Sequence, residues 1–117
     1  MVNGLEIFEH SGEGYMPNMH FESWRVATMN YSPKNDEANL TYLERHMKTD
    51  EVFVLMHGEC TLIIGKDMVR VPMKKYKIYN VKKGVWHTNF VSRDAKVLIV
   101  ENEDTGEENS EYFYFDK

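Results

Sequence analysis

Side chains that can bind a metal or move a proton gather in one short stretch of the sequence. Glu44, His46 and Glu51 lie within eight consecutive positions, and His87 follows much later in the chain. Imidazole nitrogen and carboxylate oxygen are ligands that Zn, Fe, Mn, Ni and Co all accept, typically at about 2.0 to 2.2 Å. The same groups also serve as general acids and bases near neutral pH. These residue types therefore predict either a divalent metal site or an acid–base pair.

The spacing of these residues fits a β-strand, because successive side chains of a strand point to opposite faces. A strand through this stretch places Tyr42, Glu44 and His46 on one face, and it adds Lys48 if it continues regularly. Glu51 lies across a short polar turn, at the start of an apolar run. An ammonium group from Lys48 on the same face could neutralise the carboxylates and make a metal unnecessary, because buried charges must be paired.

The order of these residues resembles the first motif of the cupin family. That motif reads His-x-His, three or four residues, Glu, six residues, Gly. Glu44 stands at the position of the first histidine, whereas His46, Glu51 and Gly58 match the remaining positions.

The second cupin motif, Pro-x-Gly-x-x-His-x-x-x-Asn, is similar to a segment further along the chain. Gly84 and His87 are in place, Lys82 replaces the proline, and Val91 occupies the asparagine position. Asn89 lies on the same strand face as His87. The resemblance implies a fold in which both motifs contribute to one lumenal site.

The resemblance covers roughly residues 40–102 and implies an all-β fold, an antiparallel β-barrel or jelly roll with little helix. Short apolar runs, separated by turn residues at intervals of about 8 to 12 residues, indicate the same class of architecture. Within a single domain spanning 1–117, we expect an N-terminal arm over 1–20, a motif core over 41–102, and an acidic loop with an aromatic C-terminal strand or arm over 103–117. The expected strands are 24–31, 39–48, 52–56, 60–64, 68–71, 76–81, 87–91 and 96–101.

Composition narrows the class of protein. The chain has 117 residues, which suits one domain, and 42% of them are hydrophobic, which suits a packed core. A net charge of -5 argues against a nucleic-acid partner. No apolar run approaches the roughly 20 residues needed to cross a bilayer, and the first residues lack the features of a signal peptide, so we expect a soluble, cytoplasmic protein without a membrane partner. Cys60 is the single cysteine and is interpreted as a core residue.

These observations leave two functional hypotheses open. The first is a cupin enzyme of the isomerase, lyase or dioxygenase type that acts on a small polar molecule. In it, a mononuclear divalent transition metal is bound by Glu44, His46, Glu51 and His87, and the expected catalytic residues are His87, Glu51 and Tyr42. The second is a metal-free module that binds or senses a small ligand without turning it over. In both cases short cupins and the aromatic C-terminus lead us to expect a homodimer.

Overall fold

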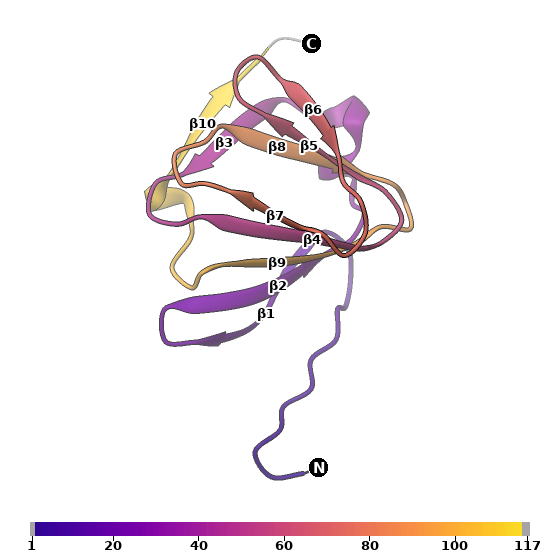
Figure 1. The fold of residues 1–117 in the computed structure, drawn as a ribbon, viewed down its shortest axis with the longest axis vertical. Coiled ribbons are helices and arrows are strands. Elements are labelled where there is room, and N and C mark those ends of the chain that lie inside the picture. Colours follow the sequence, from indigo (N-terminus) through magenta and orange to yellow (C-terminus); the bar gives the residue numbers. More distant parts are fainter. Residues whose placement is uncertain (1, 116–117) are drawn as a thin grey trace.

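Two antiparallel sheets, each of five strands, face one another in the computed structural model, which describes residues 2–115. The first sheet has the order β1-β2-β9-β4-β7 and the second the order β10-β3-β8-β5-β6 (Figure 1). The strands are β1 (Tyr15–Phe21), β2 (Trp24–Met29), β3 (Tyr42–His46), β4 (Glu51–His57), β5 (Cys60–Ile64), β6 (Val69–Pro72), β7 (Ile78–Val81), β8 (His87–Val91), β9 (Lys96–Asn102) and β10 (Ser110–Tyr114).

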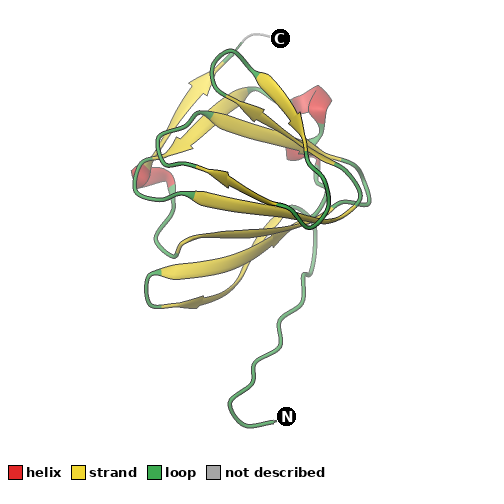
Figure 2. Ribbon diagram, in the orientation of Figure 1, coloured by secondary structure: helices red, strands yellow, loops and turns green. Residues whose placement is uncertain are grey.

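Helix is almost absent from the described residues, as Figure 2 shows. Three short 3₁₀ turns, Pro33–Asn35, Glu37–Asn39 and Glu107–Asn109, are its whole extent within residues 2–115. No helix in this part of the chain is long and apolar enough to cross a membrane. The expected all-β class with little helix is therefore confirmed.

The hydrophobic core lies between the two sheets. Phe53 and Leu55 of β4 and Val97 and Ile99 of β9 are at most 2% exposed, and each pair is spaced by two residues, as expected for side chains on one face of a strand. Cys60 belongs to the same cluster, and burial raises the pKa of its thiol to about 12. The interpretation of Cys60 as a core residue is confirmed.

Strand β3 is shorter than the expected strand, and this corrects the prediction for Lys48. The strand ends at His46, and the chain then turns, with the Met47 amide donating a hydrogen bond to the Asn109 carbonyl. The Lys48 side chain is exposed, while its carbonyl accepts a hydrogen bond from the Asn102 side chain. Lys48 therefore does not continue the face that carries Glu44 and His46.

Both ends of the chain contribute strands. Tyr15–Phe21 forms β1 and pairs with β2, so the expected N-terminal arm is limited to the residues before Tyr15. This shorter arm extends away from the body of the molecule (Figure 1). The aromatic C-terminal segment forms β10, which pairs with β3 in a register that sets Ser110 opposite His46 and Tyr112 opposite Glu44. Residues 116–117 of the expected C-terminal segment lie outside the described residues.

Candidate metal centre and cavity

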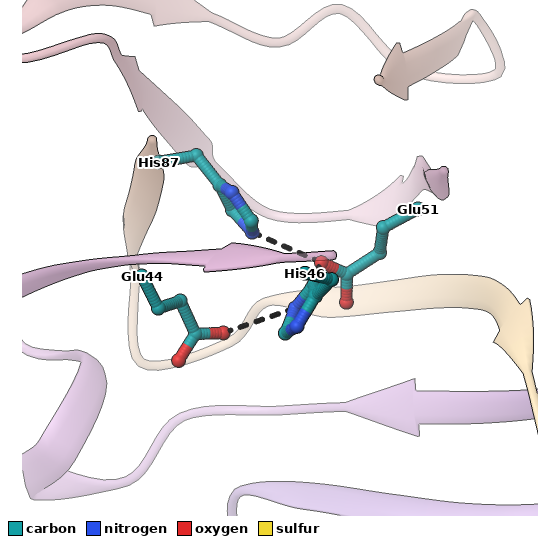
Figure 3. Close-up of side chains that lie close together, drawn as sticks. All are labelled: Glu44, His46, Glu51 and His87. Carbon is teal, nitrogen blue, oxygen red and sulfur yellow. Dashed lines mark hydrogen bonds and ion pairs between the residues drawn. The ribbon is translucent and has the colours of Figure 1, made fainter. Parts of the chain in front are cut away.

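Four side chains from three strands meet between the sheets. Glu44 and His46 come from β3, Glu51 begins β4, and His87 begins β8. One ligand atom from each side chain lies within 4.8 Å of the others, and Figure 3 shows the four groups pointing toward one another. The structure thus brings together all four residues that the sequence marked as metal ligands.

Backbone pairing explains this convergence of distant residues. Glu44 of β3 lies directly opposite His87 of β8 in the sheet. The Gly84 amide, just before β8, donates a hydrogen bond of 2.8 Å to the carbonyl of His46. Gly84 has φ +80, a left-handed conformation that glycine adopts without steric cost. The glycine of the second motif therefore connects it directly to the first.

Glu51 is the common partner of both imidazoles. Its Oε1 lies 3.1 Å from Nε2 of His46 and 3.0 Å from Nε2 of His87. Nε2 of His46 also lies 3.3 Å from Oε1 of Glu44. Glu51, His46 and His87 are 6%, 8% and 2% exposed, whereas Glu44 is half-buried and faces the cavity.

The Nδ1 atoms of His46 and His87 also have polar partners, on the side of each ring away from Glu51. His87 Nδ1 donates a hydrogen bond of 3.0 Å to the carbonyl of Val85, and this fixes the ring with Nε2 toward Glu51. His46 Nδ1 is 2.8 Å from the hydroxyl of Ser110 on β10. Such outer contacts orient imidazoles that bind a metal or exchange a proton.

The pKa values in the cluster favour positively charged histidines and a negatively charged Glu51. Burial alone would lower the pKa of His46, but hydrogen bonds to Glu44 and Glu51 outweigh it and raise the pKa to about 10. Burial opposes a raised pKa at His87 too, and Glu51 again outweighs it. For Glu51, burial would raise the pKa, yet hydrogen bonds from the two histidines lower it to about 2. Without another cation, the cluster is a carboxylate network neutralised by imidazolium.

The cluster opens into a cavity of about 610 Å³ between the sheets. Tyr42 lines this cavity on the same strand face as Glu44, and its ring packs edge-on against Tyr112 and Tyr114, with centroids 5.4 and 5.3 Å away. Burial and then the charge of Glu44 raise the pKa of Tyr42, so its hydroxyl stays protonated at neutral pH. The structure places Tyr42 in the same cavity as the cluster, and among the described residues its hydroxyl forms no hydrogen bond with either histidine.

The cavity also contains an ion pair, with a buried carboxylate and a half-buried arginine, that was not predicted from the sequence. Glu101 of β9 is 5% exposed, and its carboxylate accepts hydrogen bonds from Arg25 of β2, at 2.9 and 3.1 Å, and from the hydroxyl of Tyr15. Burial and then the charge of Glu51 raise the pKa of Glu101. Glu101 was not predicted as a cavity residue because it begins an acidic run. Its spacing from Val97 and Ile99, in steps of two residues, nevertheless places Glu101 on the core face of the strand.

Comparisons with known proteins agree with this architecture. No protein-family model matches the chain, and no curated protein matches its sequence. Among solved structures, a cupin-2 domain protein from Shewanella frigidimarina superposes with a TM-score of 0.62 at 18% identity, covering 80% of this chain and 85% of that one. An RmlC-like cupin family protein from Methanocaldococcus jannaschii gives 0.64 at 12% identity, covering 85% and 91%. The chain has the cupin fold.

A further similar structure is the nucleoside dehydratase Pac13 of Streptomyces, which has been solved with uridine. It gives a TM-score of 0.66 at 9% identity and covers 94% of this chain and 88% of that chain. At this identity the likeness concerns the cupin fold alone. The chemistry that this chain can perform therefore has to be argued from Glu44, His46, Glu51 and His87 themselves.

Proposed function

We propose that this chain is a cupin enzyme that binds a small polar molecule in its lumen, beside a divalent transition metal held by Glu44, His46, Glu51 and His87. The observation that carries the proposal is the convergence of the four ligand atoms within 4.8 Å at one wall of a cavity of about 610 Å³. Such a volume lies within the range of about 300 to 1,000 Å³ that ligand pockets typically occupy.

The donor set fits a transition metal. Ligand atoms about 2.0 to 2.2 Å from one ion lie about 3.0 to 3.5 Å from one another. The closest donor distances in the cluster are 3.0, 3.1 and 3.3 Å. His87 donates through Nδ1, so its Nε2 lone pair is free toward the cluster, as metal-bound imidazole requires. Two carboxylates and two neutral imidazoles also balance the charge of a divalent ion.

A bound metal would supply Lewis acidity, which polarises a carbonyl or lowers the pKa of a water molecule. The residues of the chain have further roles in the same reaction. Tyr42 keeps its proton at neutral pH and faces the cavity, so it can donate a hydrogen bond or a proton to the substrate. Glu51 would accept a proton from the substrate through a carboxylate oxygen that the metal leaves free. Without a metal, Glu51 and His87 are hydrogen-bonded to each other and form the acid–base pair that we expect to accept this proton.

The reaction type follows from these groups and from the fold. We infer an isomerase, lyase or dioxygenase type of activity. Carboxylates, imidazoles and a tyrosine hydroxyl beside one cavity can move protons between neighbouring atoms of a substrate, as an isomerase or a lyase requires, whereas a dioxygenase would also require O₂ and a redox-active metal such as iron in the cluster. The fold likeness to a nucleoside dehydratase supports the lyase type among the three.

A metal-free protein is the second candidate, and one observation favours it. Both imidazoles already lie within hydrogen-bonding distance of Glu51, so imidazolium groups complete the charge balance by themselves. In this alternative the cavity belongs to a ligand-binding module, or His87 and Glu51 act as an acid–base pair without a metal.

Elemental analysis separates the two candidates. The wild-type protein, purified without added metal, is compared with a His46→Ala/His87→Ala double variant and with His57→Ala, a control that removes an exposed histidine outside the cavity. We expect close to one equivalent of transition metal in the wild type and in the control, and almost none in the double variant. Equally low metal in all three, with circular dichroism showing folded protein, would reject the metal centre in favour of the metal-free candidate.

A further inference from the structure

The cavity extends beyond the Glu/His cluster, where both apolar and polar side chains line it. Met29, Leu40, Phe53 and Ile99 line it, and Asn89 adds a carboxamide. Asn89 follows His87 by two residues on β8, so the two side chains point to the same face, about 7 Å apart along the strand. A small molecule that contacts Asn89 therefore reaches the neighbourhood of the cluster.

Asn89 has unused hydrogen-bonding capacity. Its Oδ1 is buried and has no hydrogen-bond partner among residues 2–115, and its side-chain nitrogen forms no hydrogen bond within the same range. Buried polar groups are normally paired, because a donor or acceptor withdrawn from water without a partner costs stability. Across the sheet, Asn89 lies opposite Leu62, a core residue that offers no polar side-chain atom.

We propose that Asn89 binds the H–N–C=O edge of the ligand. A carboxamide presents one N–H donor side and one carbonyl acceptor, and a ligand with an adjacent N–H and C=O satisfies both at once. Because Oδ1 of Asn89 is buried, this binding mode requires a change of the side-chain rotamer that turns both ends of the carboxamide toward the cavity. The ligand class is a planar lactam, cyclic imide or pyrimidine-type ring, whose faces the apolar lining contacts. This inference rests on the proposed function, in which this cavity holds the substrate.

The polar groups elsewhere in the cavity favour a neutral amide over an anion at this end. Arg25, a half-buried cation of the cavity, uses its guanidinium for Glu101 and for the carbonyls of Glu103 and Thr105. It is therefore already engaged within the protein. Asn89 carries no charge, and Lys34, a further cation that lines the cavity, is exposed to solvent.

The experiment uses one substitution, one matched control and one pair of probes. Asn89→Leu removes the carboxamide and keeps its approximate size, while Asn80→Leu makes the same change at an exposed position outside the cavity. The probes are uracil, which has the H–N–C=O edge, and 1,3-dimethyluracil, in which both nitrogens are methylated. Dissociation constants come from ligand-observed NMR titrations, and melting temperatures are measured without a probe.

We expect wild type and Asn80→Leu to bind uracil at least tenfold more tightly than Asn89→Leu does, and all three to bind 1,3-dimethyluracil within about twofold of one another. Loss of the buried and unpaired carboxamide oxygen should also raise the melting temperature of Asn89→Leu, by about 3 to 6 °C. An asparagine that served only the structure would lower it on removal.

Three results would overturn the inference: no uracil binding by the wild type, equal weakening of both probes in Asn89→Leu, or a lower melting temperature for that variant. The metal content of the same samples tests the proposed function separately. Asn89-dependent uracil binding by a protein without metal would contradict the metal centre and leave the role of Asn89 intact. Full metal content without uracil binding would contradict the role of Asn89 and leave the metal centre intact.

Discussion

At the scale of single residues, Glu51 connects the groups of the candidate centre. The residue is 6% exposed, and its carboxylate lies within 3.1 Å of both imidazoles. A buried carboxylate needs a compensating positive charge, because desolvation otherwise favours its neutral form. Either two imidazolium groups or a metal can supply this charge, so metal binding and protonation of the histidines compete with each other.

This competition gives a pH prediction for protein freed of metal with EDTA. The pKa of His46 is raised to about 10, so its stabilising contribution is complete below its ordinary pKa of about 6.5 and is lost as the pH rises toward 10. The pKa of Glu51 is lowered to about 2, so its contribution is present above about pH 4.5 and is lost as the pH falls toward 2.

We therefore expect the melting temperature of metal-free protein to fall on both sides of the range from about pH 4.5 to 6.5. In His46→Asn the decline on the alkaline side should be smaller, because the titrating imidazole is gone. Differential scanning calorimetry across this pH range measures both curves. An alkaline decline of the same size in His46→Asn would show that another group causes it.

Ser110 is the second residue-scale case, because its hydroxyl lies 2.8 Å from Nδ1 of His46. Loss of a contact that orients a metal-binding histidine typically weakens metal affinity about 10- to 100-fold. We expect Ser110→Ala to fall in this range in competition titrations with a chelator. Lys48→Ala, which changes an exposed residue outside the cluster, is the control and should bind metal as the wild type does. Unchanged affinity in Ser110→Ala would remove this orienting role.

At the scale of elements, the turn between β4 and β5 depends on Gly58. Its φ is +74, and a Cβ built there would lie 2.8 Å from the Cα of Ala95. Gly58→Ala should therefore reduce the free energy of unfolding by about 2 to 4 kcal/mol, through the left-handed conformation together with the backbone clash. Gly12, with φ +76 and no atom within 4 Å of a Cβ built on it, isolates the first of these effects.

Urea denaturation of both variants measures the difference. Gly12→Ala should lose only about 1 kcal/mol, because its conformation is similar and nothing stands in the way of a methyl group. Equal losses at the two glycines would mean that the chain around Ala95 moves aside without cost.

The pairing of β2 with β9 contains the Arg25–Glu101 ion pair, with the two residues directly opposite in register. Arg25→Met leaves Glu101 buried without its cation, and such a loss typically costs about 3 to 5 kcal/mol. The double variant Arg25→Met/Glu101→Gln should be more stable than Arg25→Met alone, because no unpaired charge remains. Urea unfolding at pH 7 measures all variants. A double variant less stable than Arg25→Met would show that Glu101 is stabilised chiefly by Tyr15 and not by the arginine.

At the scale of the whole molecule, the N-terminal arm exposes apolar side chains to solvent. Val2, Leu5 and Ile7 are 70%, 50% and 72% exposed, and the arm extends away from the sheets (Figure 1). Apolar side chains gathered on an exposed segment typically mark an interaction site. We propose that a second copy of this chain covers the arm in a homodimer.

Size-exclusion chromatography with light scattering tests this proposal. Wild-type protein should have twice the chain mass of 13.8 kDa, and a variant without residues 2–9 should have the mass of one chain. A full-length Leu5→Ser/Ile7→Ser variant should shift in the same direction, whereas Glu6→Ser should remain a dimer. A monomeric wild type, or a dimer that survives the deletion, would contradict the proposal.

Local sequence pattern was sufficient for the fold class and for most strands. Alternation and turn residues predicted β5 and β8 with their observed bounds, Cys60–Ile64 and His87–Val91. The motif spacing also selected the four residues that converge, since strand alternation places Glu44 and His46 on one face whatever the rest of the chain does. These are properties of neighbours along the chain, and local geometry determines them.

The tertiary structure decided everything that depends on which strands meet. Lys48 lies outside the site because β3 ends at His46, where the chain turns and Met47 bonds to Asn109. Glu101 lies beside Arg25 in the cavity because β9 pairs with β2, and Ser110 lies beside His46 because β10 pairs with β3. Contacts between segments many residues apart depend on pairing and register across the sheets, and residue spacing along the chain does not contain that information.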